Sequence, residues 1–161
     1  MALAEYFWGN PRPLGKVREI KWGALEANSQ SFYAGQPVYL NAGAVTAVAS
    51  DTATHLAGIA LVDATNVTSD NIEIPILPFY PEDLWIIQTT SGGTAALPTT
   101  ATIGTMYAFY VASNIAYMDI ADTGNDAMIY HGPVYRASTS TAIYYAIVSF
   151  TPSACEWTSG T

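Results

Sequence analysis

From Ser31 onward, short segments rich in Val, Ile, Tyr, Phe and Thr alternate with clusters of turn-forming residues. This spacing is typical of all-β sandwiches and barrels. We therefore predict an all-β fold, a single small β-barrel or sandwich. The predicted strands are Val38–Asn41, Ala44–Ala49, Leu56–Asp63, Ile72–Leu77, Leu84–Thr89, Thr105–Ala112, Ile115–Ile120, Ala127–His131, Val134–Ala137 and Ile143–Phe150.

Several turns and irregularities have chemical reasons in the sequence. Asn41-Ala42-Gly43 supplies the positive φ that a tight hairpin requires. Pro37 stands where a strand begins, because its missing N–H costs least at that position. Gly58, inside "HLAGIALVD", predicts a β-bulge or a close approach of another backbone.

The first 30 residues differ from the rest of the chain. Pro11 and Pro13 favour an extended, non-helical backbone, with room for one strand at Val17–Trp22. The segment Thr89–Thr105 is a Ser/Thr/Gly/Pro-rich loop by composition. The predicted organisation is an extended N-terminal arm (1–30), a β-barrel or sandwich body (31–150) and a C-terminal tail (151–161).

Few charged residues are available to cover the surface of this chain. Of its 161 residues, 11% are charged and 50% are hydrophobic, against roughly 25% charged residues in an average soluble protein. A lone globule with so few charges tends to associate. We therefore expect an obligate assembly rather than a free monomer.

The charges are also unevenly distributed. Residues 1–21 carry four cations and two carboxylates, whereas residues 22–161 carry eleven carboxylates and a single cation, Arg136. Phosphate backbones would repel this acidic body, so we expect no nucleic-acid partner. No apolar run is long enough for a membrane span, and the first residues lack the apolar core of a secretory signal. We expect synthesis in a cytoplasm and no membrane partner.

The sequence contains no convincing catalytic constellation. Cys155 is the only cysteine, which excludes an internal disulfide and a cysteine-based metal site. His55 and His131 stand apart from any nucleophile-elbow motif. Glu82 and Asp83 are neighbours, and neighbours on a strand point to opposite faces. We predict no enzymatic activity and no cofactor.

One segment does resemble a catalytic motif. The Asp-Thr-Gly at Asp122, after an apolar run, is how retroviral-type aspartic proteases present a carboxylate. The same residues also make an ordinary hairpin turn, which is the interpretation we prefer. Asp119, Asp122, Asn125 and Asp126 could supply oxygen ligands for calcium, but their spacing does not fit an EF-hand. We predict neither a catalytic residue nor a metal site.

Stronger indications point to an interaction surface on the arm. Aromatic and Arg side chains dominate the energetics of protein interfaces. Tyr6, Phe7 and Trp8 form an aromatic cluster on this arm. The alternative is that this cluster packs against the body of its own chain. The candidate interface residues are Tyr6, Phe7, Trp8, Arg12, Lys16, Arg18 and Trp22.

The stretch from Ala34 to Ala64 carries a family resemblance. It reads as a glycine before an apolar strand ("AGQPVYL"), a turn, a second strand ("AVTAVA"), a polar loop, and "LAGIALVDA". This order resembles the N-terminal pattern of the capsid decoration, or cement, proteins of tailed bacteriophages. The residues that carry the resemblance are Gly35, Pro37, Gly43, Gly58, Ile59, Ala60 and Asp63.

The resemblance implies a β-tulip-like barrel and a mechanical task. Such proteins bind the outer surface of an assembled capsid, usually as homotrimers, and cement neighbouring major capsid subunits. It therefore implies two partners, the major capsid protein and other copies of this chain, and localisation on the virion. Two alternatives remain: another virion structural protein, such as a tail or fibre subunit, and a small aspartic-protease-like β-barrel enzyme.

Overall fold

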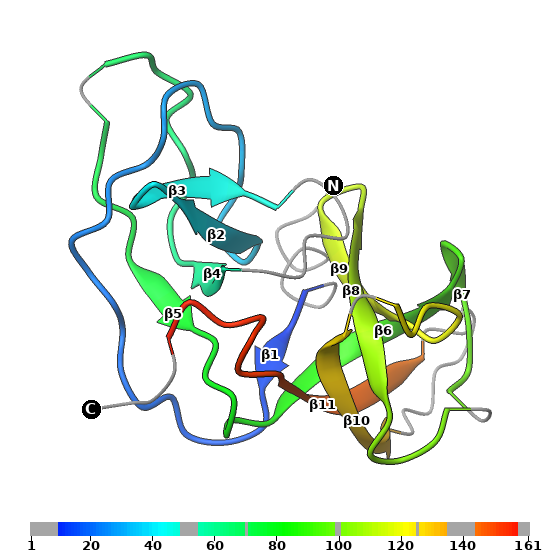
Figure 1. Ribbon diagram of the computed structural model, residues 1–161. Helices are drawn as coiled ribbons and strands as arrows, with labels where there is room; N and C mark the ends of the chain where they lie inside the picture. Colours follow the sequence, from blue (N-terminus) through cyan, green and yellow to red (C-terminus); the bar gives the residue numbers. More distant parts are fainter. Residues whose placement is uncertain are drawn as a thin grey trace.

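The computed structural model describes residues 10–48, 55–69, 71–98, 101–124, 126–134 and 144–157. Within these ranges the protein is all-β, with eleven strands in two sheets and no helix, so the predicted fold class is confirmed. Figure 1 shows the two sheets side by side, with the small sheet on the left, the larger one on the right and β1 between them.

The larger sheet closes on itself. Its strands are β1 (Arg12–Pro13), β6 (Trp85–Ser91), β7 (Thr94–Ala95), β8 (Met106–Ala112), β9 (Ile115–Asp119), β10 (Asp126–Val134) and β11 (Tyr145–Phe150). Antiparallel pairing runs in the order β6-β11-β10-β8-β9, and β9 then pairs in parallel with β6. These strands therefore form a small closed barrel, while β1 and β7 each add a short ladder to β6.

The core of the barrel is aromatic. Phe79 stacks on Phe150 with ring centroids 4.1 Å apart and meets the edge of Trp85 at 4.6 Å. All three side chains are fully buried. Phe79 lies outside the barrel strands, just after β5, so it joins the barrel core to the smaller sheet.

The smaller sheet has the order β3-β2-β4-β5. Its strands are β2 (Pro37–Asn41), β3 (Ala44–Ala47), β4 (Leu56–Ala60) and β5 (Ile76–Pro78). Asn41 pairs with Ala44 across a two-residue turn, in which Ala42 and Gly43 have φ of 50° and 84°. The predicted tight hairpin is therefore confirmed, and its positive φ angles explain why glycine stands at position 43.

Strand β4 is buried on both faces and belongs to two cores. Leu56 and Ile59 pack in the barrel core, whereas Ala57 and Ala60 pack in the core of the smaller sheet. Gly58 lies between them with φ of 149°, where the β2–β4 register shifts. A Cβ atom at this position would lie 2.0 Å from the carbonyl oxygen of Leu77. Both predicted reasons for this glycine, a bulge and a close approach, are thus confirmed.

The described part of the arm, residues 10–30, lies along both sheets. It begins as β1 beside β6, and the Leu14 N–H then donates to the Leu84 carbonyl. Lys21 next exchanges two backbone hydrogen bonds with Ile76, at the outer edge of the small sheet. This isolated bridge replaces the strand expected at Val17–Trp22.

The arm then reaches the opposite edge of the small sheet. Leu25 bridges Glu73, just before β5, and Glu26 bridges Val45 of β3 at the other edge. Because one segment contacts both outer edges of the sheet, neither edge is left open for pairing there. The described arm is therefore an integral strap of the fold.

Three further expectations need correction. The loop expected at Thr89–Thr105 contains the end of β6 and all of β7, which pair as a hairpin. The strand expected at Ala127–His131 is part of β10, which continues to Val134 with a register shift before Gly132; residues 135–137 of the second expected strand lie outside the described residues. The strand expected at Ile72–Leu77 begins only at Ile76, where the ladder with β4 starts; Glu73 and Ile74 contact the arm alone.

The tail contacts the body as far as Trp157. The Leu56 N–H donates to the Ala154 carbonyl, and the Glu156 N–H donates to the Leu56 carbonyl. The Trp157 indole N–H donates to the Ala57 carbonyl at 2.9 Å. The tail therefore runs beside β4 and is held at both ends of this stretch.

Candidate functional site

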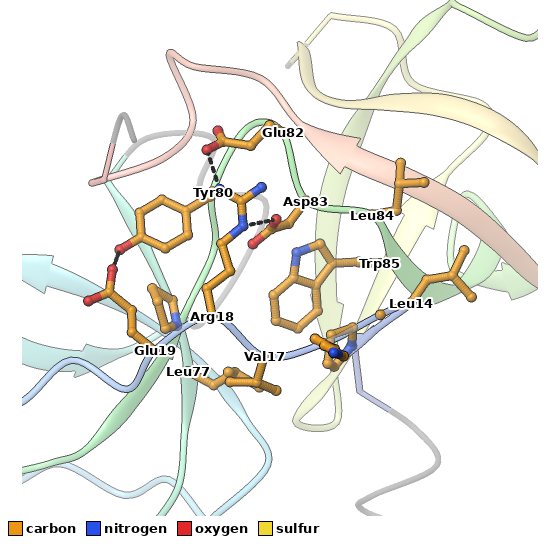
Figure 2. A pocket seen from close by; sticks show the side chains of 14 residues that line it. Leu14, Val17, Arg18, Glu19, Leu77, Tyr80, Glu82, Asp83, Leu84 and Trp85 are labelled. Atoms are coloured by element: carbon orange, nitrogen blue, oxygen red, sulfur yellow. Dashed lines mark hydrogen bonds and ion pairs between the residues drawn. The ribbon is translucent and has the colours of Figure 1, made fainter. Parts of the chain in front are cut away.

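Arg18 of the arm is clamped by two carboxylates. Its Nη1 donates to Glu82 Oε1 at 2.8 Å, and its Nε lies 2.9 Å from Asp83 Oδ1, as Figure 2 shows. Burial raises the pKa of the Asp83 carboxyl, while the Arg18 guanidinium acts in the opposite direction. The neighbouring carboxylates in the turn between β5 and β6 thus serve to hold the arm.

Lys21 of the arm lies at a junction with the tail. Its Nζ is 3.1 Å from Glu19 Oε1, 6.0 Å from the centre of the Tyr80 ring and 5.5 Å from that of Trp157. Tyr80 donates its hydroxyl to Glu19. That hydrogen bond, together with Lys21, lowers the pKa of Glu19, whereas burial is the main cause that raises the pKa of Tyr80.

The arm cations therefore face inward more than the sequence suggested. The Arg12 guanidinium lies 5.3 Å from the centre of the Tyr145 ring, and Arg18 and Lys21 contact the body as described. Lys16 is exposed and forms no ion pair within the described ranges. Tyr6, Phe7 and Trp8 lie outside the described residues.

The arm exposes its apolar side chains instead. Trp22 is 66% exposed, and its neighbours along the arm are also open to solvent. Large apolar side chains normally face a core, so several exposed ones along one short segment are unusual. We call this set the arm ridge; it comprises Leu14, Val17, Ile20, Trp22 and Leu25.

A pocket of about 260 Å³ lies between the arm and the turn that joins β5 to β6. The arm wall includes Leu14, Val17 and Arg18, and the facing wall includes Tyr80 and Trp85. Figure 2 shows the Trp85 ring among these side chains, with its nitrogen on the side that faces Asp83. Trp85 is fully buried, and its indole N–H has no acceptor among the described residues.

The residues that carry the family resemblance build the smaller sheet. Gly35 precedes β2 with φ of 93°, and its N–H donates to the Ala60 carbonyl. Asp63 accepts a hydrogen bond from the Ala34 N–H at 2.8 Å. The other motif residues are Pro37 at the start of β2, Gly43 in the hairpin turn, and Gly58, Ile59 and Ala60 in β4. All seven lie in strands and turns; two of them, Gly35 and Ile59, also line a small pocket of about 140 Å³ beside the start of the described arm.

The acidic residues weighed as catalytic or metal-binding groups support turns. Asp122 Oδ1 accepts the Gly124 N–H at 2.7 Å, as in an Asx turn. Asp119 Oδ1 accepts the N–H groups of Gly92 and Ala121, each at 3.0 Å. Asn125 lies outside the described residues, and nothing is described of the Asp126 side chain. Across the described ranges, no group of three or more His, Cys, Asp or Glu side chains is placed to hold a metal ion.

Two histidine contacts were missed at the sequence level. His131 Nε2 lies 2.8 Å from Ser149 Oγ on the neighbouring strand, and His55 Nδ1 lies 3.0 Å from Glu156 Oε2. Ser149 is buried, so the first pair ties β10 to β11.

Burial raises the pKa of the Cys155 thiol to about 12, which makes it a poor nucleophile near neutral pH.

No protein-family model matches the sequence, and no curated protein matches it either. The part of the chain that the structure describes contains no helix of the length and apolarity that a bilayer span requires. The arm ridge and the adjoining pocket are therefore the features on which a functional hypothesis can be built.

Proposed function

We propose that this chain is a structural virion protein that binds the outer surface of an assembled bacteriophage capsid and cements neighbouring major capsid subunits. The observation that carries the proposal is the arm ridge. Five large apolar side chains face solvent within twelve residues of a strap that is itself fixed to both sheets. A rigid, apolar and extended surface suits contact with another protein surface.

The resemblance of residues 34–64 to capsid decoration proteins supplies the class of partner. Only 11% of the residues are charged, and a surface with so few charges favours association with other chains. The role is mechanical: the protein has no substrate and no cofactor, and it acts on the outside of the virion after synthesis in the host cytoplasm.

The proposal is tested by substituting two residues whose side chains are equally exposed. Trp22 in the arm ridge is 66% exposed, and Ile103 in the loop before β8 is 67% exposed. In co-sedimentation with undecorated capsids, Trp22→Ser should weaken binding roughly 30-fold or more, because truncating an aromatic anchor costs about 2–4 kcal/mol. Ile103→Ser is the matched control and should bind like the wild type. Equal binding by both variants would show that the arm ridge is not the contact surface.

The proposal includes a homotrimer as the unit that binds. With so few charges, the chains should bury on the order of 2,000 Å² or more in total, as obligate assemblies do. Light scattering of the purified protein at micromolar concentration should give the mass of three chains. A monodisperse monomer would contradict this part, and open-ended polymers without capsids would favour a tail or fibre subunit instead.

A further inference from the structure

The smaller pocket, of about 140 Å³, lies where the arm meets the smaller sheet. Its walls come from β1, which Figure 1 shows between the two sheets, and from β4, β5 and the turn before β2. We call it the junction pocket. None of the described residues that line it is acidic, and its apolar lining residues include Pro11, Pro13, Ile59, Leu61 and Leu77. A cavity of about 150 Å³ with apolar walls can hold one aromatic ring, so the junction pocket has a suitable size and lining.

The polar side chains in the described wall of the junction pocket are engaged elsewhere. Asn10 is 4% exposed, and its Oδ1 accepts the Ala116 N–H of β9 at 3.1 Å. The Arg12 guanidinium lies 5.3 Å from the centre of the Tyr145 ring. The described wall therefore favours an apolar occupant over a polar or charged one.

The described chain begins in the wall of the junction pocket. Asn10 lines the pocket and is fixed there by its hydrogen bond to β9. Nine residues precede it, all outside the described residues, and the largest apolar side chain among them is that of Trp8. Only Gly9 separates Trp8 from Asn10, and two residues of extended chain span at most about 7 Å. The indole of Trp8 is therefore within reach of the pocket.

The short connection also favours an occupant from the same chain. Glycine adopts φ of either sign readily, so Gly9 allows the chain to turn back from Asn10 onto the pocket. A group held by so short a linker acts at an effective concentration in roughly the millimolar range or above. An aromatic side chain from another protein would have to displace it.

We propose that the indole of Trp8 fills the junction pocket of its own chain. The aromatic cluster then ties the start of the arm to the smaller sheet, and Trp8 is not an anchor on the capsid. This inference does not rest on the proposed function, because the arm ridge, with Trp22 as its most exposed member, is a separate surface.

The ¹⁵N relaxation of the tryptophan indoles in the full-length protein tests whether Trp8 is held. The Trp8 resonance is identified by its absence in Trp8→Phe. Its order parameter should be close to that of the fully buried Trp85 indole, about 0.85, as in a rigid structure. A value below about 0.6, as in a flexible segment, would overturn the proposal.

Two matched variants locate the ring. Leu61 lines the junction pocket and is 37% exposed, while Leu97 is 39% exposed and is not among its lining residues. Leu61→Ser should lower the order parameter of the Trp8 indole and leave that of Trp85 unchanged, whereas Leu97→Ser should change neither. Circular dichroism checks that both variants are folded. Equal values for Trp8 in the two variants would place its ring elsewhere and reject the pocket.

Isotope-filtered nuclear Overhauser effects determine which chain supplies the ring. Labelled and unlabelled chains are unfolded together in guanidinium and refolded as a mixture. Contacts between the Trp8 ring and the Leu61 methyl groups should appear within labelled chains only. Contacts between a labelled and an unlabelled chain would mean that a second copy supplies the ring, and the assignment to the same chain would be wrong.

Co-sedimentation with undecorated capsids separates this inference from the proposed function. Trp8→Ala should bind capsids like the wild type, whereas Trp22→Ser should bind more weakly. If Trp8→Ala loses as much binding as Trp22→Ser, Trp8 is a capsid anchor and the pocket assignment is wrong. If the Trp8 indole is rigid and depends on Leu61 but the wild-type protein does not bind capsids, the capsid role fails and the pocket assignment stands.

Discussion

Replacing Gly58 by Ala should destabilise the protein by about 4 kcal/mol or more and leave little folded chain at 37 °C. The added Cβ would lie 2.0 Å from the Leu77 carbonyl oxygen and 2.8 Å from the Pro78 Cα. Both neighbours belong to the backbone of β5, so no side-chain rotation can relieve the contact. The positive φ of 149° adds strain for any residue with a side chain.

Gly43→Ala is the control for this substitution. Gly43 also has a positive φ, 84°, but a Cβ there would meet nothing within 4 Å. Its cost should be only about 1–2 kcal/mol, from backbone strain alone. Guanidinium unfolding followed by circular dichroism measures both variants. A Gly58→Ala protein as stable as Gly43→Ala would mean that β4 and β5 separate at little cost.

Replacing Phe79 by Ala should cost about 3–5 kcal/mol, the range for deleting a fully buried aromatic side chain. Phe79 stacks on Phe150 and meets the edge of Trp85, so the deletion removes two ring contacts at once. Aromatic pairs of this kind add about 0.5–1.5 kcal/mol to the value of the buried area. The position lies between the barrel and the smaller sheet, where neither can move inward freely to fill the cavity.

Urea unfolding by intrinsic fluorescence gives the size of this effect. Ile103→Ala is the comparison, because its exposed side chain should change stability by no more than about 0.5 kcal/mol. A loss below about 1 kcal/mol for Phe79→Ala would show that the two sheets repack around the missing ring.

The parts of the fold that depend on neighbours in sequence were predictable. The turn at Ala42–Gly43 and the bulge at Gly58 follow from local backbone demands, and most strands fall within a few residues of their predicted ranges. The hairpin that ends in β7 was missed because Thr94 and Ala95 have no strand-like apolar pattern. The parallel closure of β6 with β9 has no local sequence pattern that identifies it.

The site was harder to predict because its contacts join distant residues. Arg18 is separated from Glu82 by 64 positions, and Glu19 from Tyr80 by 61. From sequence alone the arm cations looked available for a partner, since the two carboxylates that hold Arg18 lie far away in the sequence. The sequence did single out Trp22 as an interface residue, and that role stays a prediction. The pocket could not be foreseen, because its two walls come from segments that only the fold brings together.

The double membership of β4 determines how this molecule can be divided. β4 gives Leu56 and Ile59 to the barrel core and Ala57 and Ala60 to the core of the smaller sheet, so it belongs to both parts. Separating the barrel from the smaller sheet would leave one of the two cores without the side chains of β4. The arm bonds to Val45 of β3 and Ile76 of β5, and the tail bonds to Leu56 and Ala57 of β4, so both segments fasten onto the smaller sheet. The barrel and the smaller sheet, joined by the arm, therefore form one unit that cannot be exchanged in parts. New sequences are better inserted at exposed loops.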